Sequence, residues 1–415
     1  MQIESRFLRV GAAVALVVGA TLYLRLALQP FRAAHAAAVP GRENLERAIQ
    51  LEPSNAEYHD RLGLNLMYSG DDPQAAIPEL HRAVDLNPYA ARYWVDLANA
   101  DLVAGRSSEQ RESLERAVLA EPTTPDVAWE AANFFLLQGD RDKALHNFRV
   151  VLSNDPDNVA QAIELCWRAA GDPTVVLDEA LPTRPDLYFS FLNLLMQNQN
   201  TAAAETVWNR LVALKQPFSI KLAFPYVRFL LTQREVRAAQ NAWQDLASIS
   251  PILAPYLPTR ANLIVNAGFE QKILDGGFDW LYRPNPHVDL AIDTSEFHSG
   301  ARSLSIAFDG QNPPDAGIFQ FVPVKANTDY AFSAAYRTED ILSASGPRFS
   351  ITDAYTGASY VLTDDFLGTH SWQLQQAQFR TGPRTELLLL SVTRQPGNPL
   401  IRGKMWIDDF ELIEK

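Results

Sequence analysis

Proline recurs at a nearly constant interval in the first part of the chain, and this constrains the fold more than any other feature. The repeated prolines are Pro53, Pro88, Pro122 and Pro156, and their intervals agree to within a single position. A glycine follows each of the first three prolines at the same offset, at Gly70, Gly105 and Gly139. Because proline stops helices and glycine favours the turn after a helix, the pattern predicts one helical hairpin in each interval.

Small residues stand at fixed places in these predicted hairpins. In the first helices they occur in the pairs Leu62-Gly63, Leu97-Ala98 and Ala131-Ala132. In the second helices they are Ala75, Ala83, Ala117 and Ala144. Through these residues, and through Trp94 at the position where the family has an aromatic residue, residues 55–156 resemble the tetratricopeptide (TPR) family. The resemblance implies helices that approach closely and bury their apolar faces only against neighbouring units.

Two further helical hairpins are predicted around residues 186–214 and 219–249. Their second helices place Trp208 and Trp243 at the interval that separates Pro53 from Pro88. We therefore expect residues 41–255 to form one all-α, TPR-like solenoid whose C-terminal repeats are degenerate.

The TPR resemblance implies a concave groove that receives a protein partner. In the register of that family, Asn99 and Asn133 occupy a groove-facing position that holds peptide backbone, and Leu64 occupies it in the first repeat. Arg92 would add a contact to a carboxylate. The alternative is that both asparagines are ordinary solvent-facing helix residues. Trp94 and Trp129 are expected to be packing residues.

The N-terminal segment is apolar enough to enter a membrane. Residues 10–24 carry no charge and follow Arg6 and Arg9, and the run extends through Arg25 to Leu28, close to the roughly 20 residues that span a bilayer. We expect residues 1–32 to form a single transmembrane anchor, with the bulk of the chain outside the cytoplasm. The alternatives are a signal peptide cleaved near the alanine-rich residues 34–38, and a buried helix of a soluble protein.

Composition and motifs exclude several functional classes. A net charge of −13 argues against a nucleic-acid partner, because phosphate binding needs a basic surface. The single Cys166 cannot form an internal disulfide. We find no P-loop, GxGxxG, GxSxG or HExxH motif, so the sequence predicts no enzyme, and a hydrolase built on the C-terminal domain is the least favoured reading.

Beyond Pro251, Pro255 and Pro258, which predict a linker, the helical period disappears. Short β-rich runs separated by turn residues follow, over 303–308, 317–324, 330–336, 348–352, 374–379, 386–392 and 404–413. About eight strands in this segment indicate an all-β antiparallel sandwich over residues 262–415.

Four motifs give this segment a second resemblance. They are Asn266-Ala-Gly-Phe-Glu270, His298-Ser-Gly-Ala-Arg-Ser-Leu304, Gln320-Phe-Val-Pro-Val324 and Trp406-Ile-Asp-Asp-Phe-Glu-Leu412. In order and spacing the segment resembles the galactose-binding-like jelly rolls found in many carbohydrate-binding modules. The resemblance is strong for the fold and weak for the ligand, since this fold carries many binding functions.

The jelly-roll resemblance also implies a structural calcium ion. Its ligands would be Glu270, a backbone carbonyl near Ser299 or Gly300, and Asp408 or Asp409, because calcium prefers carboxylate and carbonyl oxygens. The alternative is that these carboxylates end strands at a solvated edge. No other cofactor is expected.

Sugar binding requires an exposed aromatic platform. The candidates in predicted loops are Trp280, Tyr282, Tyr355 and Tyr360, although Trp280 also suits a core position. Trp372 at the start of one strand and Trp406 ahead of the last strand are expected to be core residues.

Two functional hypotheses follow. The first is a membrane-anchored scaffold of the bacterial cell envelope, whose solenoid binds a protein partner and whose jelly roll binds a partner or a glycan, in exopolysaccharide biosynthesis or export. The second is an envelope protein whose jelly roll holds a polysaccharide. A surface aromatic platform would favour the second.

Overall fold

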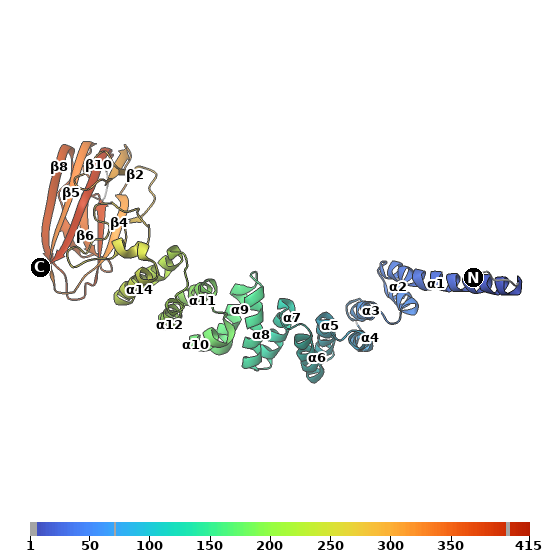
Figure 1. Ribbon diagram of the computed structural model, residues 1–415. Coiled ribbons are helices and arrows are strands. Elements are labelled where there is room, and N and C mark those ends of the chain that lie inside the picture. The colour runs from blue at the N-terminus through green and yellow to red at the C-terminus, as the bar shows by residue number, and fades with distance from the viewer. Residues whose placement is uncertain (1–5, 70–71, 396–398) are drawn as a thin grey trace. The chain divides into compact units, whose positions relative to one another are not determined.

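The computed structural model describes residues 6–69, 72–395 and 399–415. The chain divides into two compact units, Met1–Ser190 and Phe191–Lys415. The first unit is helical, and the second joins helices to a β-sandwich (Figure 1). The predicted fold class, an all-α repeat array followed by an all-β antiparallel sandwich after an apolar N-terminal helix, is confirmed.

The first unit is a succession of helical hairpins. Its helices are α1 (Arg6–Ala37), α2 (Arg42–Leu51), α3 (Ala56–Tyr68), α4 (Pro73–Leu86), α5 (Ala91–Val103), α6 (Ser107–Ala120), α7 (Pro125–Leu137), α8 (Arg141–Asn154), α9 (Val159–Ala170), α10 (Pro173–Val175) and η1 (Val176–Ala180). Helix α11 (Pro185–Gln197) runs across the division between the units.

The repeated residues act at the helix ends. Each repeat proline lies in the connection that follows a second helix, so it separates one hairpin from the next. Gly105 and Gly139 follow the first helices with φ of +73°, a left-handed conformation that glycine adopts without strain. Asp72 and Asp140 cap the helices after the turns by accepting bonds from Ala75 and Lys143 backbone N–H groups. Gly70, which the sequence places in a turn, lies outside the described residues.

The small residues let the helices of a hairpin approach closely. A Cβ on Gly63 would lie 2.5 Å from Cγ of Leu80, so only glycine fits between α3 and α4. Ala83, Ala117 and Ala144 are fully buried. Ala75 is only half-buried, and its neighbour Ala76 is the one that enters the core.

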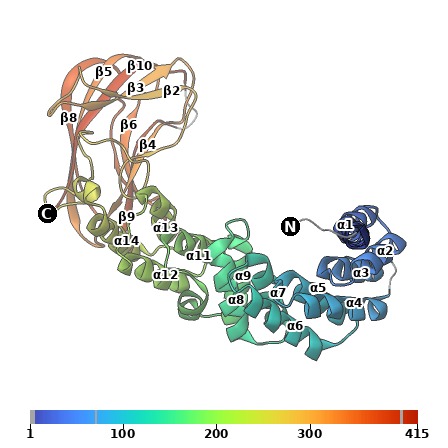
Figure 2. The same cartoon turned by 45° about the vertical axis from the view of Figure 1, so that its right-hand side comes forward.

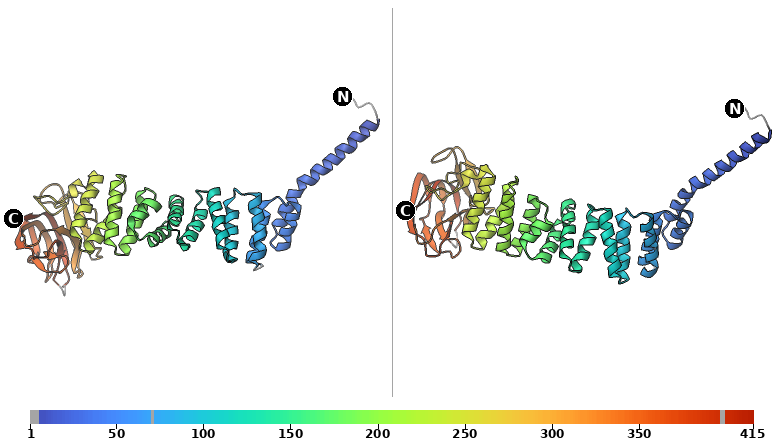
Figure 3. Two further views of the ribbon diagram at one scale, coloured as in Figure 1. Left: turned by 90° about the horizontal axis from the view of Figure 1, so that it is seen from below. Right: turned by 60° about the horizontal axis from the view of Figure 1, so that its bottom comes forward.

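Helix α1 has two parts with different surroundings (Figure 3). Over residues 10–24 it is exposed, and its segment Val10–Ala37 is long and apolar enough to cross a membrane, by length and composition. Near its C-terminal end, Ala33 and Ala37 are buried in the core shared with α2 and α3. The Arg61 guanidinium donates to the carbonyl of Ala37 over 2.6 Å, which fixes this end to the first repeat.

The second unit begins with the two predicted C-terminal hairpins. They are formed by α11, α12 (Thr201–Ala213), η2 (Ile220–Ala223), α13 (Phe224–Thr232) and α14 (Val236–Ile249). Two of the prolines predicted to mark an extended linker, Pro251 and Pro255, instead belong to a 3-10 helix, η3 (Pro251–Tyr256). A proline is tolerated at the first position of such a helix because the missing N–H has no helical partner there, and Leu253 and Tyr256 are buried.

Two antiparallel sheets form the sandwich. Within the described residues, one has the order β1-β4-β9-β6-β7 and the other β2-β3-β10-β5-β8. The strands are β1 (Leu281–Tyr282), β2 (Val288–Asp293), β3 (Ser303–Asp309), β4 (Asp315–Pro323), β5 (Asp329–Leu342), β6 (Arg348–Asp353), β7 (Ser359–Leu362), β8 (Gly368–Arg380), β9 (Leu387–Thr393) and β10 (Arg402–Glu414).

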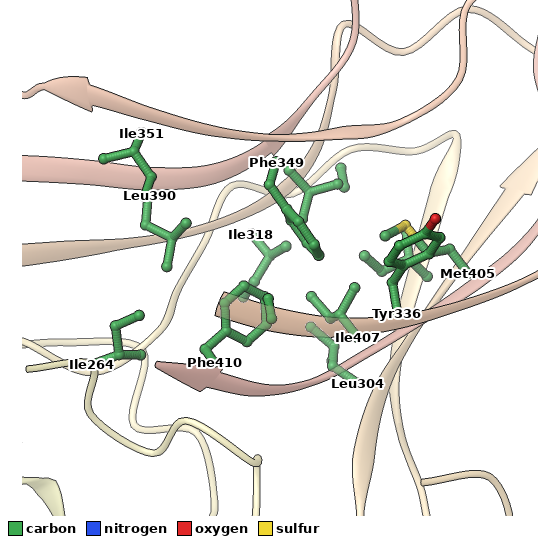
Figure 4. Close-up of a cluster of buried hydrophobic side chains, with 14 of the residues drawn as sticks. Ile264, Leu304, Ile318, Tyr336, Phe349, Ile351, Leu390, Met405, Ile407 and Phe410 are labelled. Carbon is green, nitrogen blue, oxygen red and sulfur yellow. The ribbon is translucent and has the colours of Figure 1, made fainter. Parts of the chain in front are cut away.

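Side chains from both sheets meet in one apolar core (Figure 4). Phe349 on β6 and Phe410 on β10 have ring centroids 5.3 Å apart, so aromatic rings join the two layers. All seven predicted β-runs are strands. The strands β1, β2 and β7 are additional to those predicted.

Candidate functional site

The first helices of the hairpins line one side of the first unit. Successive first helices contact one another, α3 with α5 and α5 with α7, and these helices follow one another along the array (Figure 2). On this side Arg92 of α5 reaches back to Asp60 of α3, with 3.4 Å between Nη2 and Oδ2. The Arg92 side chain is 61% exposed, whereas the Asp60 side chain is 1% exposed.

Asp60, which is buried, and Asp96, which is half-buried, form a pair of carboxyls beside this guanidinium. Burial, and then the negative charge of Asp96, raise the pKa of Asp60 to about 7. Burial also raises the pKa of Asp96. Both carboxyls therefore bind a proton more tightly than a solvated aspartate does, while the Arg92 charge acts in the opposite direction on both.

The predicted groove asparagines are both half-buried. Asn133 donates from Nδ2 to the carbonyl of Trp129 over 2.8 Å, so part of its hydrogen-bonding capacity is used within its own helix. Trp94 donates from Nε1 to the carbonyl of Pro88 and packs against the core of the first unit. Trp129 packs edge-on against Phe148 at 5.8 Å.

The carboxylates predicted to bind calcium converge on the loop before β3. Glu270 accepts from the backbone N–H of Ala301 and Arg302 at 2.7 and 3.1 Å. Asp408 accepts from the N–H groups of His298 and Ser299 at 2.8 and 3.2 Å. The Oδ1 and Oδ2 atoms of Asp409 contact the Ser299 hydroxyl and the His298 ring.

Each of these carboxylates therefore accepts at least one hydrogen bond from the loop, and calcium binding by them stays a prediction. Within the described residues, no group of three or more His, Cys, Asp or Glu side chains is arranged to hold a metal. In this structure the three carboxylates tie the loop to the first and last parts of the sandwich by hydrogen bonds.

Two of the four predicted platform aromatics do not present a free ring. Trp280 is 1% exposed, stacks on Phe269 at 5.1 Å and donates from Nε1 to the carbonyl of Asn266. It is a core residue and does not form a surface platform. Tyr360 is half-buried, stacked on Phe379, and its hydroxyl lies 2.6 Å from that of Thr385.

Tyr282 and Tyr355 lie close to the helices of the second unit. The Tyr355 hydroxyl donates to the carbonyl of Leu231 over 2.8 Å, and the Arg234 guanidinium lies 5.1 Å from its ring centre. Burial raises the pKa of both tyrosines to about 12, so both are neutral donors at physiological pH.

Of the two tryptophans expected to be core residues, Trp406 is buried and Trp372 is only half-buried. Trp406 is within β10 rather than ahead of it, and it is buried between the cations of Lys404 and Arg337, 4.5 and 5.0 Å from its ring. Trp372 is half-buried on β8, beside His298 at 5.6 Å. Neither is part of the apolar cluster between the sheets, and Trp406 alternates with Met405 and Ile407, which are in that cluster.

Asp60 and Asp96 could not be recognised from the sequence, because isolated acidic residues on a helix are usually solvated. The available signal for Asp60 was its place one helical turn after Ala56 and one turn before Gly63, on the face that is buried. Phe319 and Phe321 were assigned only to a strand. Their alternation with Ile318 and Val322 could have indicated a second apolar face.

No family model matches the chain. Among solved structures, the helical part is similar to the MamA protein, with 19% identity, a TM-score of 0.31, and coverage of 44% of this chain and 97% of that one. The sandwich is similar to a CBM4 structure, with 12% identity, a TM-score of 0.28, and coverage of 37% and 99%. It is also similar to the structure of TmCBM61 in complex with β-1,4-galactotriose, with 18% identity, a TM-score of 0.28, and coverage of 37% and 99%. By the geometry of its own elements, the chain joins a TPR-like helical part to a sandwich like that of carbohydrate-binding modules.

Proposed function

We propose that the protein is a membrane-anchored, non-enzymatic scaffold of the bacterial cell envelope. Its TPR-like part binds a protein partner, and its sandwich binds a second partner or a glycan, in the synthesis or export of an exopolysaccharide. The observation that carries the proposal is the polar site on the first helices, where exposed Arg92 lies beside the buried carboxyl of Asp60.

The chemistry of this site suits a polypeptide ligand. Arg92 offers forked N–H donors to a carboxylate of the partner. Asp60 holds the guanidinium from its buried side, so the N–H groups on its exposed side remain available to the partner. Asn99 on the same helix supplies both a donor and an acceptor for peptide backbone.

The packing of α1 favours an uncleaved anchor over a signal peptide. Val10 to Leu28 would extend about 28 Å as a helix, which matches the apolar thickness of a bilayer. Cleavage among residues 34–38 would remove the buried Ala33 from the core of the first hairpins. A cleaved segment has no such packing role, so the buried C-terminal end of α1 supports retention of the helix in the mature protein.

Site-directed photocrosslinking in native membranes tests the scaffold function. A benzoylphenylalanine at Asn99, on a first helix, is compared with one at Leu119, a 76% exposed residue on a second helix. We expect a discrete crosslinked protein from position 99 and none from position 119. Arg92→Ala should remove that product. Equal crosslinking at both positions, or a product unaffected by Arg92→Ala, would contradict binding at the first helices.

The alternative function is that of an envelope protein whose sandwich holds a polysaccharide. The observation that favours it is the presence of Tyr282 and Tyr355, two of the predicted platform aromatics, in the wall of one cavity of the second unit.

A further inference from the structure

A cavity of about 770 Å³ lies within the Phe191–Lys415 unit, between its helices and the sandwich. One wall is formed by η2 and α13, which contribute Lys221, Phe224 and Arg228. The other wall is formed by strands β1, β4 and β9 together with the loop that carries Tyr355. The volume is in the range of roughly 300–1,000 Å³ that holds small ligands.

The strand wall is apolar and aromatic because β4 and β9 have two buried faces. Ile318 and Val322 of β4 enter the core of the sandwich, so Phe319 and Phe321 point to the opposite side. By the same alternation, Leu389 of β9 faces the cavity and its neighbours face the core. The rings of Phe319 and Phe321 meet edge-to-face at 5.7 Å.

Direct contacts hold the two walls together. A Cβ on Gly276 or Gly277 would overlap the ring of Phe224 or Trp243, respectively, so the two glycines let the loop before β1 lie directly on the helices. Trp243 is also edge-on to Phe278 at 6.2 Å. The hydrogen bond from Tyr355 to Leu231 closes the other end. The cavity is therefore a feature built by packed elements on both sides.

The charge of the cavity is opposite to that of the chain. The whole protein has a net charge of −13. The cavity is nevertheless lined by three cations, Lys221, Arg228 and Arg283, and by a single acid, Asp275. Asp275 is engaged by the backbone N–H of Tyr282. Of the three cations only Arg283 has an ion pair among the described residues, with Asp315 at 3.0 Å.

We infer that this cavity binds an acidic oligosaccharide, one that contains uronic acid units. Aromatic side chains such as Phe321 and Tyr282 pack against the C–H faces of pyranose rings. Lys221 and Arg228 on the opposite wall pair with the sugar carboxylates. The inference rests on the glycan-binding form of the proposed function and assigns the ligand class and the place of binding.

Binding of trigalacturonate to the full-length protein in detergent, measured by calorimetry at low and moderate salt, tests this inference. Galactotriose serves as the neutral ligand of equal length, and a short polyglutamate peptide serves as the acidic ligand without sugar rings. The variant Lys221→Gln/Arg228→Gln removes both unpaired cations. The control Arg237→Gln/Arg384→Gln removes two exposed arginines of the same unit that do not line the cavity.

We expect trigalacturonate to bind at least about tenfold more tightly than galactotriose, with affinity that falls as salt rises. The cavity variant should weaken trigalacturonate binding at least about tenfold, and the control variant less than about twofold. Phe321→Leu should also weaken it, because a leucine fills the space without a ring face.

Three results would overturn the inference. The first is equal affinity for the acidic and neutral trisaccharides, and the second is equal affinity for polyglutamate, which would make this a peptide site. The third is saccharide binding that the cavity variant leaves unchanged, which would leave glycan binding intact but place it elsewhere. If the folded protein binds no saccharide, the glycan part of the proposed function fails as well, while the crosslinking test of the protein partner stands independently.

Discussion

Adding one methyl group at Gly277 should loosen the sandwich from α14. Gly277 has a φ of +63°, and a Cβ there would lie inside van der Waals distance of three ring carbons of Trp243. Trp243 is 1% exposed and donates from Nε1 to the carbonyl of Tyr256, so its ring cannot move without breaking a buried hydrogen bond.

The free energy of unfolding that Gly277→Ala should lose has two separate contributions. A left-handed backbone costs an alanine about 1–2 kcal/mol. Forcing extra volume into a packed site costs about 1–3 kcal/mol more. Gly357 is a matched control, because its φ is +72° and a Cβ there meets nothing within 4 Å. Gly357→Ala should therefore lose about 1–2 kcal/mol, and Gly277→Ala about 2–5 kcal/mol.

Two measurements separate the backbone contribution from the packing contribution. They are urea unfolding and hydrogen exchange detected by mass spectrometry. With a urea dependence of about 3 kcal/mol per molar, the extra cost of about 1–3 kcal/mol moves the midpoint of Gly277→Ala about 0.3–1 M below that of Gly357→Ala. Peptides from α13 and α14 should exchange faster in Gly277→Ala and at the wild-type rate in Gly357→Ala. Equal midpoints for the two variants, with equal protection of α14, would refute the contact between Gly277 and Trp243.

Three further outcomes are expected. Burial raises the pKa of Asp279 from 3.8 to about 6, so its folded state binds the proton more tightly. The stability it contributes should fall by about 2 kcal/mol as pH rises from about 4 to about 6. Asp279→Asn should remove this slope in urea unfolding measured across that range, whereas an unchanged slope would contradict its burial. Ala33→Leu introduces a larger side chain at a fully buried site and should destabilise the first hairpins by about 1–3 kcal/mol. Hydrogen exchange in α2 and α3 should then become faster. Exchange at the wild-type rate would show that α1 is not packed against them. Burial raises the pKa of the Cys166 thiol to about 12, so iodoacetamide at pH 8 should label it only in urea; rapid labelling of the folded protein would contradict that position.

The helical half was predictable because its signals are local. Proline, glycine and small residues act within one hairpin, so their spacing alone indicates the fold. The β half was predictable where strands are buried on one face. The strands that were missed are short or largely exposed, such as β1 with two residues and β2, none of whose residues is fully buried. In such strands the alternation of apolar and polar residues is weak.

The candidate sites were less predictable because they combine residues distant in the sequence. Tyr282 and Tyr355 were recognised as loop aromatics, but Lys221 lies on a helix that precedes the whole sandwich in the sequence. Nothing local to Tyr355 indicates that Arg234 stacks on its ring. The burial of Trp280 has the same origin, since its neighbours in space come from the opening and closing segments of the sandwich.

Because the cavity lies between helices and strands, ligand binding should stabilise the contact between its two walls. A ligand that touches both α13 and β4 binds only while the two walls are together, so it stabilises their contact by mass action. At a ligand concentration about 100 times the dissociation constant, this stabilisation is about 2.7 kcal/mol. Saturating trigalacturonate should therefore slow hydrogen exchange in α13, β1 and β4 together. It should leave α3 and α5, which belong to the other unit, at their original rates. Protection of the strands without protection of α13 would place the saccharide on the sandwich alone and would contradict a site shared with the helices.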